Sequence, residues 1–171
     1  MPGYIHVYTG NGKGKTTAAI GQSIRAAGAG MKIYFAQFVK GQIYSEIKII
    51  KEKLPEIEIE QFGRDCFIKK KPEPEDIKIA REGFETVKNK IFSRAYDLVV
   101  LDEINIAIFY DLLTLDEVID LLNNKPRNLE LILTGRRASK AIIEKADLVT
   151  EMKEIKHYYK KHIEARPGIE F

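Results

Sequence analysis

The sequence predicts an α/β protein whose mostly parallel sheet is covered by helices on both faces. Three observations support this fold class. Short apolar segments alternate with longer segments of helical period, as in parallel sheets. The segment Leu98–Leu101 (LVVL) is apolar at every position, which is typical of a strand buried on both faces. The glycine-rich segment Thr9–Thr17 (TGNGKGKTT) lies between a predicted strand and a predicted helix.

Six segments are predicted as strands because they are short, rich in β-branched or aromatic residues, and bounded by turn residues. They are Tyr4–Thr9, Lys32–Val39, Ile57–Phe62, Tyr96–Asp102, Leu129–Thr134 and Leu148–Met152. Because Tyr96–Asp102 contains the fully apolar run, we expect it to be covered on both sides.

Four segments show the period or the start and stop signals of helices. They are Thr16–Ala29, Asp76–Phe92, Thr114–Leu122 and Ser139–Ala146. Alanines favour the first helix, and the third begins with a capping-box pattern, Thr114 and Glu117. The expected core positions are Ile20, Ile24 and Ala27 in the first helix and Ile79, Phe84, Val87 and Ile91 in the second. The segment 156–171 has no clear period and stays unassigned.

The composition predicts one domain, residues 1–171, in the cytoplasm. The single cysteine, Cys66, cannot form an internal disulfide, which favours a reducing compartment. No apolar stretch approaches the ~20 residues of a membrane helix, and no signal peptide is visible. The net charge of +3 is spread over many lysines and glutamates. We therefore expect neither a nucleic acid nor a membrane as partner.

The glycine-rich loop predicts a phosphate-binding site. Gly14, Lys15 and Thr16 match the end of the pattern Gly-x4-Gly-Lys-Ser/Thr, whereas Thr9 occupies the first glycine position. Loop amides and the helix N-terminus would point at a polyphosphate, Lys15 would neutralise its charge, and Thr16 would hold magnesium. An incidental glycine-rich turn is the alternative, which the flanking strand and helix disfavour. The expected architecture is that of a P-loop NTPase of the RecA-like type.

Two carboxylates, Asp102 and Glu103, follow the buried strand. Ligands bind at this end of the strands in open α/β sheets. One carboxylate can hold Mg²⁺ or Mn²⁺, directly or through water. A solvated acid pair is the alternative reading, and the nearby phosphate loop disfavours it. The two motifs predict a nucleoside triphosphate site but leave the reaction open, since kinases, motor ATPases and nucleotidyl or adenosyl transferases all use such motifs.

The ordered set of motifs resembles the phosphate-loop ATP:corrinoid adenosyltransferases. The set comprises TGNGKGKTTAA at Thr9–Ala19, Arg25, QFVKG at Gln37–Gly41, VVLDEIN at Val99–Asn105, TGR at Thr134–Arg136, ADLVTEM at Ala146–Met152 and GIEF at Gly168–Phe171. The resemblance covers nearly the whole chain and includes the variant loop with Thr9 and Gly10. It implies transfer of the 5′-deoxyadenosyl group of ATP to the Co(I) of a reduced corrinoid, with release of triphosphate, in cobalamin biosynthesis or salvage.

The resemblance also implies roles for individual residues. Lys15, Glu103 and Arg25 are expected to be catalytic, and Thr16, Glu103 and Asp102 to hold the metal. Arg25 lies ten residues beyond Lys15, about 15 Å along a helix, so a surface arginine is the alternative. ATP and triphosphate contacts are expected from Gly10, Asn11, Gly12, Lys13, Gly14, Lys15, Thr16 and Thr17. Further lining residues are expected at Gln37, Lys40 and Arg136.

The sequence departs from the family in two places. Bacterial members carry a Phe-Thr-Trp segment under the corrinoid, whereas this chain has no tryptophan and reads FGRDCF at Phe62–Phe67. Phe62 and Phe67 are candidates for an apolar wedge against the corrinoid, with core packing as the alternative. Many relatives carry a helix ahead of the first strand, and this sequence begins almost on that strand, so we expect the site to close differently.

The resemblance also implies two kinds of partner. One is a reductase or reduced flavoprotein that donates electrons, and the other is a second copy of the chain in a homodimer.

Two other functions stay open at the level of the sequence. A P-loop ATPase or small-molecule kinase would use the same loop and acid pair, need no corrinoid, and release ADP. A corrinoid-binding carrier or sensor would retain both ligands without turnover, and the missing tryptophan motivates this possibility.

Overall fold

The computed structural model describes residues 2–64 and 71–170. It contains one sheet of six parallel strands in the order β3-β2-β4-β5-β1-β6, so the predicted fold class is confirmed. The strands are β1 (Ile5–Thr9), β2 (Ile33–Phe38), β3 (Ile57–Phe62), β4 (Leu98–Asp102), β5 (Glu130–Thr134) and β6 (Leu148–Glu151). The helices are α1 (Lys15–Gly28), α2 (Ser45–Lys53), α3 (Pro74–Phe92), α4 (Ile104–Phe109), α5 (Leu115–Asn124) and α6 (Lys140–Lys145), followed by a 3-10 turn, η1 (Tyr158–Lys161).

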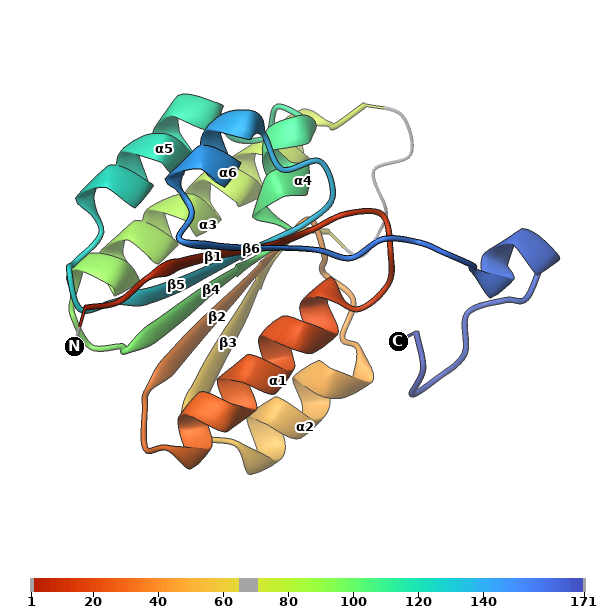
Figure 1. The fold of residues 1–171 in the computed structure, drawn as a ribbon, viewed down its shortest axis with the longest axis horizontal. Helices are drawn as coiled ribbons and strands as arrows, with labels where there is room; N and C mark the ends of the chain where they lie inside the picture. The colour runs from red at the N-terminus through yellow and green to blue at the C-terminus, as the bar shows by residue number, and fades with distance from the viewer. Residues whose placement is uncertain (1, 65–70, 171) are drawn as a thin grey trace.

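Helices cover both faces of the sheet (Figure 1). The helices α3, α4, α5 and α6 lie above it, and α1 and α2 lie below it. Along β4, Val99 and Leu101 pack with the upper layer, whereas Leu98 and Val100 pack with the lower layer. All five residues of β4 are buried, as its apolar sequence predicts.

The helix α1 contacts the sheet through small side chains. Its buried residues after Lys15 are Ala19, Ser23 and Ala26. The prediction that Ile24 faces the core is wrong, because its side chain is 46% exposed. The other two predicted core residues, Ile20 and Ala27, are only partly buried. Small residues let the helix approach the sheet closely. The side of α1 that faces the core therefore carries alanines, and the isoleucines lie beside it or outside it.

The helix α3 follows its predicted pattern at three of four positions. Phe84, Val87 and Ile91 are buried, whereas Ile79 is partly exposed and Ala80 is buried beside it. Three elements were not predicted from the sequence, namely α2, α4 and η1. In the part of the chain that the structure describes, no helix is both long and apolar enough to cross a membrane.

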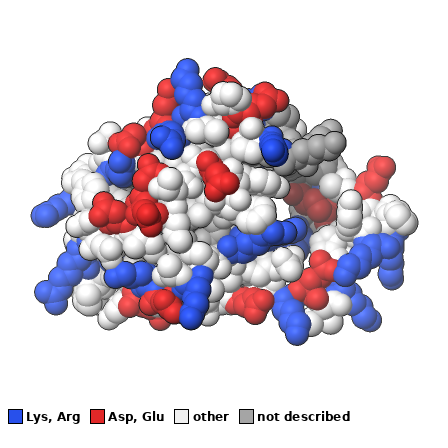
Figure 2. Space-filling model, turned by 90° about the horizontal axis from the view of Figure 1, so that it is seen from above, with Lys and Arg blue, Asp and Glu red and all other residues white. Residues whose placement is uncertain are grey.

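After β6 the chain leaves the sheet as an arm, which we call the tail (residues 152–170). It forms η1 and returns toward the N-terminal end of α1 (Figure 1). Every tail residue is at least partly exposed. From above, acidic and basic side chains are interspersed over the upper helices, and several lysines and arginines gather at the right-hand end, where the tail projects (Figure 2).

Candidate nucleotide and metal site

The loop between β1 and α1 wraps around the ammonium group of Lys15. The Lys15 Nζ atom donates hydrogen bonds to the carbonyl oxygens of Gly10 (2.8 Å) and Gly12 (2.7 Å). Lys15 is buried, and this burial lowers the pKa of its side chain below the ordinary lysine value. The loop thus fixes one positive charge in its centre, where a phosphate would bind.

Two glycines in this loop meet requirements that a side chain would violate. Gly14 has φ 117° and forms the N-cap of α1, a left-handed conformation that suits glycine. The Gly12 amide donates to the Met152 carbonyl oxygen at 2.6 Å, and a Cβ at Gly12 would lie 2.7 Å from that oxygen. Thr9, at the position of the missing first glycine, accepts a hydrogen bond from the Ala138 amide. The variant loop is therefore tied to the segments that follow β5 and β6.

Asp102, at the end of β4, is fully buried and surrounded by hydrogen-bond donors. Its Oδ1 atom accepts from the Thr16 hydroxyl (2.9 Å) and the Thr134 hydroxyl (2.6 Å). Its Oδ2 atom accepts from Gln37 Nε2 (2.9 Å), since Gln37 lies beside Asp102 in the register of β2 and β4. Asp102 therefore orients the Thr16 hydroxyl, and Gln37, itself buried, acts on the site through Asp102.

Glu103 is the carboxylate that faces the cavity. Its φ of 58° lies in the left-handed region, which is uncommon for a residue other than glycine, and it turns the chain from β4 into α4. The Glu103 amide donates to the Thr134 hydroxyl at 2.9 Å, which holds this turn in place. Burial raises the pKa of Glu103, and the charge of Asp102 raises it further, against the opposing effect of Lys40 and Lys15.

Lys40 follows β2 and approaches the acid pair. Its Nζ atom lies 3.2 Å from the Thr16 hydroxyl, 3.4 Å from Asp102 Oδ2 and 3.8 Å from Glu103 Oε1. Burial lowers the pKa of Lys40, but the two carboxylates raise it more, so its pKa lies above the ordinary value. Lys40 is therefore a charged neighbour of both acids.

These groups surround a cavity of about 510 Å³ at the carboxyl ends of the strands, a size that suits a small molecule. It is lined by Gly12, Lys13, Gly14, Lys15, Thr16, Thr17, Ile20, Lys40, Tyr44, Ser45, Glu46, Glu103, Arg136, His157, Gly168, Ile169 and Glu170. Most of the predicted phosphate-loop residues thus meet Glu103 and Arg136 in one place.

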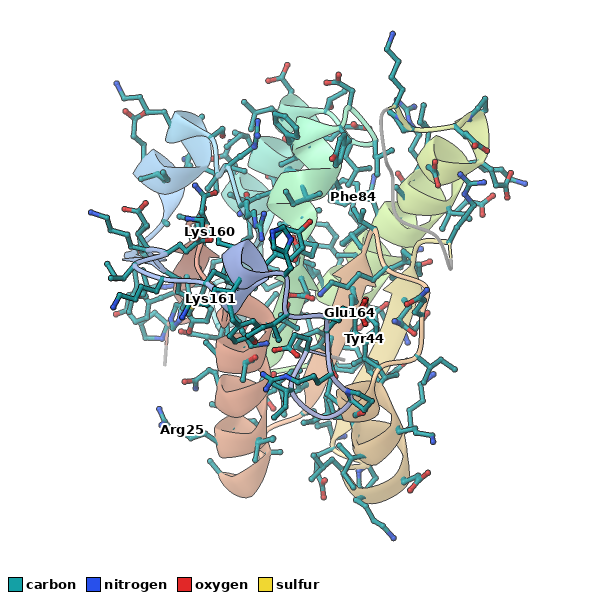
Figure 3. The ribbon with its side chains drawn as sticks, turned by 90° about the vertical axis from the view of Figure 1, so that its right-hand side faces the viewer. Arg25, Tyr44, Phe84, Lys160, Lys161 and Glu164 are labelled. Atoms are coloured by element: carbon teal, nitrogen blue, oxygen red, sulfur yellow. The ribbon has the colours of Figure 1, made fainter. Side chains whose placement is uncertain are left out.

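Other predicted site residues lie elsewhere. Arg25 is exposed and projects outward from the lower part of α1 (Figure 3), away from the cavity lining. Asn11 is exposed on the loop, and Gly10 contributes its carbonyl to Lys15 without lining the cavity. Phe62 packs beside Phe38, with ring centroids 5.7 Å apart, in the upper core. The remaining wedge candidate, residue 67, lies outside the described residues.

Two parts of the lining were not predicted as site residues from the sequence. One is the start of α2, with Tyr44, Ser45 and Glu46, and the other is the tail, with His157 and residues 168–170. The Lys13 ammonium donates to the Ile169 carbonyl oxygen at 2.7 Å, which joins the tail to the phosphate loop. The GIEF motif at the C-terminal end could have indicated that the tail reaches the site. The sequence of α2 has no feature that distinguishes it from an ordinary surface helix.

The donor atoms in the cavity fit a magnesium ion. Within residues 2–64 and 71–170 there is no group of three or more His, Cys, Asp or Glu side chains that could bind a metal alone. Mg²⁺ commonly uses one or two carboxylates and completes its coordination with water and substrate phosphates. The Thr16 hydroxyl and the Glu103 carboxylate, with Asp102 behind them, supply oxygens of this kind.

The class of protein follows from the fold and the site together. The parallel sheet, the lysine-centred phosphate loop and the acid pair after a central strand are the features of a P-loop NTPase fold. The structural comparison agrees at the level of the fold. A crystal structure of the RadB recombinase aligns with a TM-score of 0.57 and 15% identity, covering 91% of this chain and 77% of that one.

The sequence comparisons identify the family. The family model described as ATP:corrinoid adenosyltransferase BtuR/CobO/CobP matches residues 1–171. The corrinoid adenosyltransferase of Escherichia coli K12 is 35% identical over 170 residues, which is 99% of this chain and 86% of that protein. The corrinoid adenosyltransferase of a Sinorhizobium species is 37% identical over 172 residues, 99% of this chain and 80% of that protein. The chain belongs to the ATP:corrinoid adenosyltransferase family, and its activity is adenosyl transfer to a corrinoid.

Proposed function

We propose that this chain transfers the 5′-deoxyadenosyl group of ATP to the Co(I) of a reduced corrinoid and releases triphosphate, in cobalamin biosynthesis or salvage. The observation that carries this proposal is the cavity in which Lys15, Thr16 and Glu103 meet, in a member of this family. A site of this kind is suited to hold a leaving group with several negative charges.

In the proposed reaction, the cobalt electron pair attacks the ribose 5′ carbon of ATP. A Co–C bond forms, the C–O bond to the triphosphate breaks, and the electron pair of that bond leaves with the triphosphate. Because cobalt is the nucleophile, the protein needs no nucleophilic side chain. Its tasks are to orient the two reactants and to stabilise the charge that develops on the triphosphate. The Lys15 ammonium and the loop amides supply this stabilisation, and Arg136 adds a positive charge in the cavity wall.

We include a magnesium ion in this site. Thr16 and Glu103 would hold it, and Asp102 would keep the Thr16 hydroxyl oriented. When bound, Mg²⁺ supplies further neutralisation of the phosphate charge. A reductase or reduced flavoprotein as electron donor, a homodimer and a cytoplasmic location complete the proposal on the strength of the family resemblance.

The products decide between the proposed reaction and its alternatives. The protein is incubated with ATP, Mg²⁺, a corrinoid and a strong chemical reductant, and the corrinoid spectrum and the phosphate products are measured. We expect adenosylated corrinoid and triphosphate in equal amounts. ADP and phosphate without any need for corrinoid would instead indicate an ATPase or kinase, and retention of both ligands without turnover would indicate a carrier or sensor.

A further inference from the structure

The ammonium group of Lys40 lies among the oxygen atoms that are suited to a metal ion. It is within 3.2 Å of the Thr16 hydroxyl, 3.4 Å of Asp102 Oδ2 and 3.8 Å of Glu103 Oε1. These oxygens come from the start of α1 and the end of β4, so three chain segments converge on one positive charge. The side chain of Lys40 is 19% exposed, and it lines the same cavity as the phosphate loop.

A metal ion and this ammonium group cannot share the position. The two cations would lie within a few ångströms of each other in a partly desolvated site, where like charges repel strongly. A metal ion that binds Thr16 and Glu103 must therefore displace the Lys40 ammonium. The lysine side chain is long and flexible. Because Lys40 lines the cavity, its displaced ammonium group can turn toward the space available to a polyphosphate.

We propose that Lys40 is a displaceable counter-ion of the metal site, which blocks metal binding alone and turns to the triphosphate when the metal enters. This inference rests on the proposed function. Metal and triphosphate would then bind cooperatively, because the triphosphate gives the displaced ammonium a new anionic partner. Lys40 is thus a positioning residue that favours the complete metal–nucleotide pair over the metal by itself.

The first experiment measures Mn²⁺ binding without nucleotide, by the electron paramagnetic resonance signal of free Mn²⁺. Lys40→Met removes the competing charge and should bind Mn²⁺ about tenfold more tightly than the unmodified protein, with Lys40→Gln as a second neutral variant. Lys40→Arg keeps the charge and should behave like the unmodified protein. Lys51→Met, which removes an exposed lysine of α2 outside the cavity, is the matched control.

The second experiment measures binding of inorganic tripolyphosphate by calorimetry. Without metal, Lys40→Met should bind it within about threefold of the unmodified protein, because Lys40 is still held by the carboxylates. With saturating Mg²⁺, the variant should bind it several-fold more weakly. This change with metal separates a displaced counter-ion from a lysine that only supports the fold.

Three results would overturn the role of Lys40. They are an Mn²⁺ affinity of the neutral variants equal to or weaker than that of the unmodified protein, a loss of tripolyphosphate binding that does not depend on Mg²⁺, and a lack of Mn²⁺ binding in every variant. The proposed reaction is judged separately, from the triphosphate or ADP that the unmodified protein releases.

Discussion

In the proposed reaction, Lys15 carries the positive charge at the centre of the phosphate loop. We expect Lys15→Ala to lower kcat by about 100- to 1,000-fold, by analogy with the loss of one charge-stabilising donor in other active sites. Burial lowers the pKa of Lys15, which means that burying this charge lowers the free energy of unfolding. The variant lacks this unfavourable term and should therefore stay folded. Turnover and circular dichroism on the same preparation check both parts, and near-normal turnover would contradict the role of the loop.

Arg25→Ala tests whether the family arginine acts within a single chain. Arg25 is exposed and lies outside the cavity lining. We therefore expect kcat/KM for ATP to stay within about twofold of the unmodified protein, because the substitution removes no interaction with a ligand in the cavity. A loss comparable to that of Lys15→Ala would show that a bound ligand or a second chain brings this arginine to the nucleotide.

Glu103 should make the free energy of unfolding depend on pH. Its pKa is raised in the folded protein by burial and by Asp102, so the folded state binds its proton more tightly than the unfolded state does. Stability contributed by this group is therefore present at low pH and lost as the pH rises through the raised pKa. We expect Glu103→Gln to gain stability relative to the unmodified protein as the pH increases from about 4.5, the ordinary value, to neutrality. Urea unfolding across this range measures the difference, and a constant difference would contradict the prediction.

For single residues, the spacing of the motifs was enough to predict that Lys15, Thr16 and Glu103 lie at one cavity. It was not enough to orient Gln37, which the register of β2 and β4 turns toward Asp102. It also left the direction of Lys40 open, because that direction depends on the turn after β2, where Val39 has φ 66°. Sequence spacing predicts which side chains reach the same edge of a sheet, but the local backbone decides which of them face the ligand.

The contact between β3 and α3 helps to decide whether Phe62 is a wedge against the corrinoid or a core residue. Phe62 packs beside Phe38, and a Cβ on Gly83 of α3 would lie 2.3 Å from the Phe62 ring. We expect Phe62→Ala to lower the free energy of unfolding by about 2–3 kcal/mol, less than for a fully buried phenylalanine. The KM for the corrinoid should stay within about twofold, because the ring supports the core.

Phe92→Ala is the matched control for this prediction. Phe92 ends α3 and is 49% exposed, so its loss should cost less than about 1 kcal/mol. Urea unfolding and corrinoid kinetics on both variants separate the two readings of Phe62. Unchanged stability together with a large rise in the corrinoid KM would show that Phe62 is a wedge after all.

Strands and helices could be predicted from the sequence where their own residues carry a clear apolar pattern. All six strands were placed to within two residues, and the run in β4 was enough to predict burial on both faces. The helix α4 was missed because INIAIF is rich in β-branched residues, and the left-handed turn at Glu103 starts the helix without a sequence signal. The helix α2 buries only Ile47 and Ile50, which is too few residues to establish a period.

For the molecule as a whole, the tail should affect ligand binding more than stability. Its residues are at least partly exposed, yet residues 168–170 line the cavity and Lys13 bonds to Ile169. We expect a chain ending at Lys153 to keep its Tm within about 2–4 °C, which corresponds to 1 kcal/mol or less for this size. The KM for ATP should rise about 3- to 10-fold, since tenfold corresponds to about 1.4 kcal/mol of lost contacts.

Lys161→Ala is the control for the truncation, because this exposed tail lysine does not line the cavity. It should leave the KM for ATP unchanged at moderate salt, where exposed charges are screened. An unchanged KM in the truncated chain would contradict a binding role of the tail. The tail has no period in the sequence because it has no buried side. The GIEF motif is its one sequence signal, and the contact of Ile169 with Lys13 is seen only in the structure.

The two ends of the described chain lie at opposite ends of the parallel strands. The Gly3 amide donates a hydrogen bond to the Arg127 carbonyl oxygen, ahead of β5 and at the amino ends of the strands. Glu170 lines the cavity at the carboxyl ends of the strands. This decides where the protein can be handled in the laboratory. An affinity tag, fluorophore or surface linker placed before β1 would leave the cavity open. The same group attached after Glu170 would lie beside the cavity, so the amino end is the better place for a label.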